Sequence, residues 1–104
     1  MEVLAFKMKL LPGYADEYKK RHDLIWPELK NLLSAHGISD YSIFLDEESH
    51  FLFGKMTVEN AASLTILPES PLMKEWWAYM KDIMVTNDDA SPVSIPLKPV
   101  FFME

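Results

Sequence analysis

The hydrophobic residues of this chain change their spacing in a definite order along its length, and that order limits the folds open to it. Residues 3–10 alternate with a period of two, which predicts a strand with one more apolar face. Residues 14–36 carry apolar side chains at helical spacings, and Gly37 is a suitable C-terminal stop. Residues 41–46 and 51–58 are rich in aromatic and β-branched residues, so they predict two strands, and the short polar link between them predicts a hairpin.

The second half of the chain predicts one more helix and one more strand. Residues 60–67 have the pattern of a short helix or an irregular turn, and the next helix is expected to begin near Pro71. Residues 87–92 are rich in Asn, Asp, Ser and Pro, which is typical of a loop. Residues 93–103 predict the last strand, and its two prolines restrict it to a sheet edge or to irregular pairing, because proline donates no backbone hydrogen bond.

Together these segments predict one α+β domain. Pro27 lies inside the first helical region and predicts a kink or break near residues 25–26. The order is otherwise β-α-β-β-α-β, that of the ferredoxin-like α+β sandwich, and residues 1–104 have the length of a single domain. Two helices cover only one face of a sheet, so the other face meets solvent, a ligand or a second copy of the chain. A symmetric dimer with facing sheets is the simplest arrangement.

The charge and composition disfavour several classes of partner. The formal net charge is −6 and Arg21 is the only arginine, so a nucleic acid, which requires clustered Lys and Arg, is not an expected partner. No apolar run approaches the roughly 20 residues of a membrane helix, and charged residues interrupt the N-terminus where a secretory signal would be apolar. The absence of cysteine excludes disulfides and thiol nucleophiles and fits a cytoplasmic protein. A small neutral ligand suits this chain best.

The most informative candidate for chemistry is the pair Tyr18 and His22. Four residues separate them, which is about one helical turn, so in a helix both side chains project from the same face. An imidazole gives or takes a proton near neutral pH, as acid-base catalysis requires. The alternative is a partly exposed surface histidine, or a core histidine bonded to a backbone carbonyl.

Aromatic residues elsewhere are candidates for ligand binding. Tyr18 and Tyr41 each offer a ring face and a hydroxyl, which suits a polyhydroxylated ligand, although each could simply pack in the core. Trp76 and Trp77 are adjacent, so on a helix they point about 100° apart and cannot both face the middle of one core. Either one lines a pocket, or one is in the core and the other at an interface. The histidines lack a recognisable metal-ligand spacing, so no metal site is expected.

Four segments, in this order and spacing, resemble the L-rhamnose mutarotase family: RHDLIWPEL (21–29), YSIFLD (41–46), WWAYMKDIM (76–84) and NDDASPVS (87–94). The resemblance spans nearly the whole chain and rests on the combination of segments. It implies a small dimeric α+β barrel that interconverts the α and β anomers of L-rhamnose without metal or organic cofactor. By position, it places the family's proton-donating histidine on His22 and its sugar-binding residues on Tyr18, Tyr41, Trp76 and Trp77.

Mutarotation requires one proton to leave the anomeric hydroxyl and another to reach the ring oxygen. We expect His22 to protonate the ring oxygen, while Tyr18, a carboxylate or water could serve as the base. A cofactor-free or haem-using oxygenase of the same barrel architecture is the alternative within catalysis, because fold does not fix function. A non-catalytic sugar-binding module is the second alternative.

Overall fold

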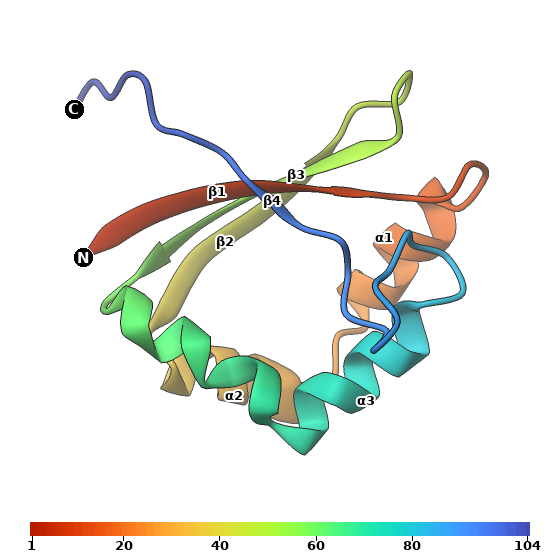
Figure 1. The fold of residues 1–104 in the computed structure, drawn as a ribbon, viewed down its shortest axis with the longest axis horizontal. Helices are drawn as coiled ribbons and strands as arrows, with labels where there is room; N and C mark the ends of the chain where they lie inside the picture. The colour runs from red at the N-terminus through yellow and green to blue at the C-terminus, as the bar shows by residue number, and fades with distance from the viewer.

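The computed structural model describes residues 1–104 and consists of a four-stranded antiparallel sheet with helices along one face (Figure 1). The strand order across the sheet is β2-β3-β1-β4, which confirms the predicted ferredoxin-like α+β topology. The strands are β1 (Glu2–Lys9), β2 (Ile38–Leu45), β3 (Phe51–Val58) and β4 (Ile95–Pro96). The helices are α1 (Ala15–Asp23), α2 (Pro27–Ala35) and α3 (Pro71–Met80), with 3-10 turns η1 (Ala61–Thr65) and η2 (Leu67–Glu69) before α3.

The predicted break in the first helical region is confirmed. α1 ends at Asp23 and α2 begins at Pro27, which occupies the first helical position, where its missing N–H costs no hydrogen bond. Trp26 has the extended backbone that the residue before a proline adopts, with φ −59° and ψ 128°. The chain therefore changes direction between two separate nine-residue helices.

The core lies between the helices and the inner face of the sheet. β1 and β3 pair along their whole length, and every second residue of each strand points towards the helices. Phe6 lies opposite Gly54 in this ladder, and its ring fills the space where a side chain on Gly54 would lie. The buried cluster consists of Met8, Leu10, Tyr18, Leu29, Leu52, Trp76, Met80, Ile83 and Met84.

The prediction of a long last strand over residues 93–103 was wrong in extent. Only Ile95 and Pro96 pair with β1, and the Leu97 amide donates to the Ala5 carbonyl at 2.9 Å just beyond them. Pro99 cannot continue the ladder, because it lacks an N–H. Residues 100–103 consequently extend away from the sheet with exposed side chains (Figure 1). The predicted edge position of this strand is confirmed.

The second predicted strand begins earlier than expected. β2 starts at Ile38, three residues before Tyr41, because Ile38 is buried and pairs with Val58. A register shift between Ser39 and Ser42 places Tyr41 at an irregularity in the strand.

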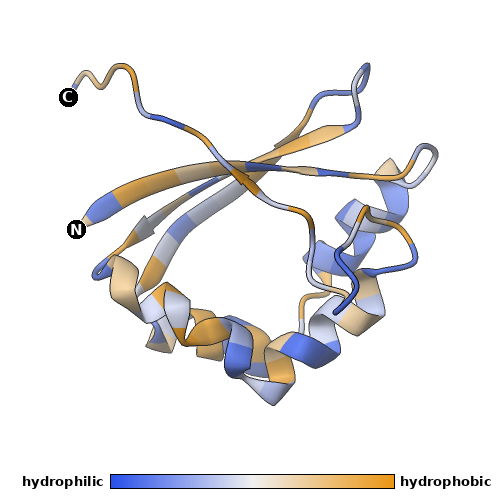
Figure 2. Ribbon diagram, in the orientation of Figure 1, coloured by the Kyte–Doolittle hydropathy of each residue, from blue (hydrophilic) through white to orange (hydrophobic).

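The outer face of the sheet remains partly apolar. Hydrophobic residues run along most of β1 and β3 in Figure 2, whereas α1 is largely hydrophilic. On the outer face, Val3, Phe44 and Phe53 are 52%, 66% and 37% exposed. None of the helices is long and apolar enough to cross a membrane.

Candidate active site

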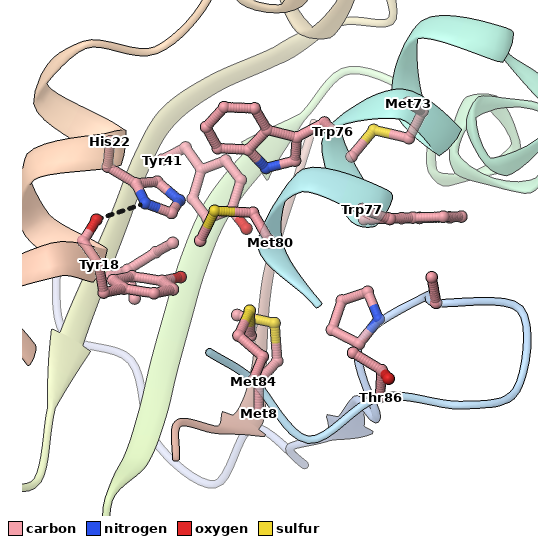
Figure 3. A pocket seen from close by; sticks show the side chains of 13 residues that line it. Met8, Tyr18, His22, Tyr41, Met73, Trp76, Trp77, Met80, Met84 and Thr86 are labelled. Atoms are coloured by element: carbon pink, nitrogen blue, oxygen red, sulfur yellow. Dashed lines mark hydrogen bonds between the residues drawn. The ribbon is translucent and has the colours of Figure 1, made fainter. Parts of the chain in front are cut away.

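The five residues selected from the sequence line one cavity between the helices and the inner face of the sheet (Figure 3). Tyr18 and His22 come from α1, Tyr41 from β2, and Trp76 and Trp77 from α3. The other lining residues are Met8, Ile43, Met73, Met80, Met84, Thr86, Ala90 and Pro92. These thirteen residues include no Asp, Glu, Lys or Arg, so this part of the site suits an uncharged ligand. A larger hollow that shares all five selected residues also includes charged side chains, such as Asp23 and Asp89.

Tyr18 and His22 form a closely coupled unit within one turn of α1. Their rings stack with centroids 4.2 Å apart and an interplanar angle of 26°. His22 Nδ1 lies 3.0 Å from the carbonyl oxygen of Tyr18, and because a carbonyl only accepts, Nδ1 carries the proton of this bond. Nε2 is then the ring nitrogen available to a ligand. His22 therefore combines two of the predicted environments, because it bonds to a backbone carbonyl and also lines the cavity.

His22 is neutral in this setting at neutral pH. Burial lowers the pKa of His22 below its usual value, against the opposing effects of the Tyr18 carbonyl and nearby Asp23. The indole of Trp76 lies edge-on to the imidazole, with centroids 5.5 Å apart and the planes at 87°, and contributes to this burial. With the proton on Nδ1, the Nε2 lone pair is a hydrogen-bond acceptor.

The two tyrosines act as hydrogen-bonding groups in their protonated forms. Burial raises the pKa of Tyr18, and the proximity of Tyr41 raises it further. Partial desolvation raises the pKa of Tyr41 to about 12, although 39% of the residue remains exposed. Both phenols keep their protons at neutral pH, so the structure disfavours Tyr18 as the base. The edge of the Phe6 ring supports Tyr41 from the sheet, with centroids 6.1 Å apart.

The two adjacent tryptophans both contact the cavity, although they occupy different environments. Trp76 is only 6% exposed and belongs to the core, where Trp26 packs edge-on against it at 5.0 Å. Trp77 is half-buried and lies on the other side of the helix turn, beside Met73 (Figure 3). The sequence predicted that one tryptophan lines a pocket, or that one lies in the core and the other at an interface. In the structure Trp76 does both, since it is a core residue and part of the cavity wall.

Arg21 connects α1 to the end of α3. Its Nε lies 2.7 Å from Glu17, and its Nη1 lies 2.9 Å from Asp82 and donates to the Tyr79 carbonyl at 2.8 Å. The hydrogen bond to Asp82 raises the pKa of Arg21, and the same contact lowers the pKa of Asp82. The guanidinium also lies over the Tyr79 ring, 4.5 Å from its centroid. Arg21, the residue before His22, thus holds α1 against the second helix that forms the cavity.

The methionines of the cavity wall were not among the site residues predicted from the sequence. Met73 and Met80 lie three residues before and four residues after Trp76, a spacing that places all three on one side of α3. That signal was available in the sequence. Met8 and Met84 come from segments whose approach to α3 depends on the tertiary fold, as do Thr86, Ala90 and Pro92. No group of three or more His, Cys, Asp or Glu side chains is arranged to hold a metal ion.

The family model described as L-rhamnose mutarotase matches residues 3–103 of this chain. An L-rhamnose mutarotase of Brucella anthropi is 57% identical over 102 residues, which cover 98% of this chain and 96% of the relative. The crystal structure of an L-rhamnose mutarotase from Formosa agariphila has a TM-score of 0.93 and 52% identity, with complete coverage of both chains.

A more distant solved structure shows how widely the fold itself occurs. A protein from Mycobacterium tuberculosis has a TM-score of 0.60 at 12% identity, covering 98% of this chain and 97% of that one. At this identity the likeness concerns the fold alone and says nothing about an oxygenase activity. The similarity to the mutarotases extends instead to sequence over the whole length. This chain belongs to the L-rhamnose mutarotase family.

Proposed function

We propose that this chain interconverts the α and β anomers of L-rhamnose by opening and reclosing the sugar ring. The observation that carries the proposal is the position of His22, whose one available nitrogen lies in an uncharged cavity lined by aromatic rings. Family membership supplies the reaction class, and the lining agrees with a neutral monosaccharide as the substrate.

His22 serves as the proton donor to the ring oxygen, using a proton that it has first accepted. The anomeric hydroxyl and the ring oxygen are bonded to the same carbon, C1, so one nitrogen can reach both. Nε2 accepts the hydroxyl proton as the C1 carbonyl forms, the bond from C1 to the ring oxygen breaks, and the proton passes to that oxygen. Rotation about the C1–C2 bond and the reverse steps give the other anomer. Proton transfer by a positioned group typically contributes about 10²- to 10⁴-fold to the rate.

The aromatic residues hold the sugar during these transfers. Tyr18 and Tyr41 keep their protons and can each donate one hydrogen bond to a sugar oxygen. Trp76 and Trp77 present ring surface to the C–H groups of the pyranose and exclude water from the reacting carbon. No carboxylate is among the thirteen residues drawn in Figure 3, so this proposal assigns the role of the base to Nε2.

NMR exchange spectroscopy between the two L-rhamnose anomers tests the proposal directly. We expect wild-type protein to accelerate exchange well above the buffer rate, and His22→Ala to lose about 10²- to 10⁴-fold of that acceleration. His36→Ala is a matched control, because His36 Nδ1 lies 2.9 Å from the Leu32 carbonyl but its side chain is outside the cavity. Exchange at the buffer rate with wild-type protein would refute the function, and full activity in His22→Ala would refute the role of His22.

A homodimer is the proposed assembly. The chain exposes 7273 Å², whereas a compact monomer of 12.1 kDa is expected to expose about 6,000 Å². Large exposed apolar residues lie on the outer face of the sheet and in the C-terminal residues 100–103, which are about 80% exposed or more. Facing sheets from two copies would cover Phe44 and Phe53, and residues 100–103 could pack against the second copy.

A further inference from the structure

One side of the cavity is formed by three buried methionines. Met8, Met80 and Met84 are 6%, 3% and 6% exposed, and they come from β1, from the last residue of α3 and from the turn that follows it. The backbone bridge between Leu10 and Met84 holds that turn against the end of β1. In Figure 3 Met8 and Met84 lie together, and Met80 lies closer to His22. We refer to Met8, Met80 and Met84 as the methionine floor.

The polar groups of the cavity are distributed unevenly around this floor. The available donors and acceptors are the imidazole of His22, the hydroxyls of Tyr18, Tyr41 and Thr86, and the indole nitrogens. A thioether is a weak acceptor and cannot donate, so the floor offers almost nothing to a hydroxyl. L-Rhamnose has the same asymmetry, because four of its ring carbons carry hydroxyls and the fifth carries the C6 methyl group.

The proposed chemistry fixes where the methyl group has to lie. C6 is bonded to C5, which is bonded to the ring oxygen, so C6 is only two bonds from the atom that His22 protonates. In Figure 3 Met80 is drawn next to His22, with Met8 and Met84 farther from it. A sugar whose ring oxygen reaches Nε2 can therefore direct its methyl group at the floor and its hydroxyls at the polar groups.

We infer that the methionine floor is the specificity determinant for the 6-deoxy position, accepting a methyl group at C6 and rejecting a hydroxymethyl group. This inference rests on the proposed function and adds to it the residues that choose the substrate. A hydroxyl at C6 would be buried against sulphur and carbon without a hydrogen-bond partner. Apolar pockets reject an added hydroxyl by about 10²-fold in kcat/KM, and a missing methyl group costs about 10- to 200-fold.

A series of three sugars tests the inference with the wild-type protein alone. L-Lyxose, L-rhamnose and L-mannose carry hydrogen, methyl and hydroxymethyl at the same carbon and are otherwise identical. We expect L-rhamnose to have the highest kcat/KM for anomer exchange, by about 10²-fold over L-mannose and at least about tenfold over L-lyxose. Equal values for L-rhamnose and L-mannose would overturn the inference while leaving the proposed function intact. Exchange of L-rhamnose at the buffer rate would instead refute the function.

Substitutions in the floor assign the preference to its residues. Met80→Gln and Met84→Gln keep the side-chain length and add an amide, so we expect the ratio of L-rhamnose to L-mannose to fall to about tenfold or less. Met80→Leu keeps the floor apolar and should retain the wild-type ratio. Ile66→Gln, at a residue that is 60% exposed and lines neither this cavity nor the larger hollow, controls for an added amide and should also retain it. An unchanged ratio in both floor variants would assign the selectivity elsewhere.

Discussion

His22 makes two contacts with the same residue, stacking its ring on the ring of Tyr18 and donating from Nδ1 to the Tyr18 carbonyl. Both contacts arise within one helical turn, so the orientation of the imidazole depends on local structure that α1 provides by itself. The hydrogen bond selects the tautomer and leaves Nε2 free, as in other sites where the second ring nitrogen sets the role of the first. The chemistry of the site follows from that choice.

The first prediction concerns pH. Because burial lowers the pKa of His22 below 6.5, the neutral form that accepts the first proton predominates at neutral pH. We expect kcat/KM to be constant above that pKa and to fall as the pH is lowered through it. Exchange rates measured across the pH range, together with an NMR titration of the His22 ring protons, check this. A kinetic midpoint above 6.5, or activity that rises with acidification, would contradict the assigned protonation state.

The second prediction concerns the tyrosine hydroxyls. Tyr18→Phe and Tyr41→Phe remove one donor each and keep the ring, so each should lower kcat/KM by about 2- to 10-fold. The folded structure should be retained, since neither hydroxyl has a hydrogen-bond partner within the protein. Tyr14→Phe, at the start of α1 and outside the cavity, is the control and should have no effect on exchange. A loss as large as that of His22→Ala would mean that a tyrosine takes part in proton transfer.

The third prediction concerns Arg21 as a positioning residue. Arg21→Lys keeps the charge but loses the fork that reaches Glu17, Asp82 and the Tyr79 carbonyl together, so we expect a Tm lower by a few degrees and a reduced kcat. The pH midpoint assigned to His22 should also move, because the helix that carries it is held less firmly. Lys20→Ala, an exposed neighbour on the same helix, should change none of these quantities. An unaltered midpoint and kcat in Arg21→Lys would limit Arg21 to a role in stability.

The fourth prediction concerns the contact between Phe6 and Gly54. A methyl group on Gly54 would overlap the Phe6 ring, so Gly54→Ala should destabilise the fold by about 1–3 kcal/mol in urea unfolding. Because Phe6 supports Tyr41, the affinity for sugar should fall as well. The double variant with Phe6→Leu should recover part of the stability, and the lack of any recovery would show that the overlap is not the cause.

The fifth prediction concerns the proposed dimer. Phe44→Glu places a charge on the outer face of the sheet, where Phe44 lies opposite Phe53, and should shift the mass measured by light scattering towards that of a monomer. Leu24→Glu is the matched control, because Leu24 is 69% exposed but lies in the connection between α1 and α2. A wild-type protein that is already monomeric at micromolar concentration would contradict the proposed assembly.

Local signals in the sequence predicted much of this architecture. The break at Pro27, the hairpin of β2 and β3 and the pairing of Tyr18 with His22 all depend on residues close in the chain, whose steric and periodic preferences are strong. The short last strand was not predictable from composition, because its end depends on which amides find a partner on β1.

The residues of the cavity also divide into those predictable from local spacing and those that depend on tertiary contacts. Met73 and Met80 share a helix side with Trp76 and could have been selected from spacing alone. Met84 and Arg21 acquire their roles only through the packing of distant segments, Met84 on Leu10 and Arg21 on Asp82. The spacing of residues along the chain does not predict such contacts. The residues proposed to determine sugar specificity were therefore harder to predict from the sequence than the residues proposed for proton transfer.

Because side chains alternate along β1, neighbouring residues of this strand face the cavity and the outer surface of the sheet. Met8 points into the cavity, while Lys7 and Lys9 on either side of it lie on the outer face, with their ammonium groups 4.5 and 4.8 Å from the centre of the Phe51 ring. A substitution that reshapes the outer face therefore acts on the same peptide units that carry the wall of the cavity. A partner that presses on the outer face would therefore also bear on the wall that Met8 forms.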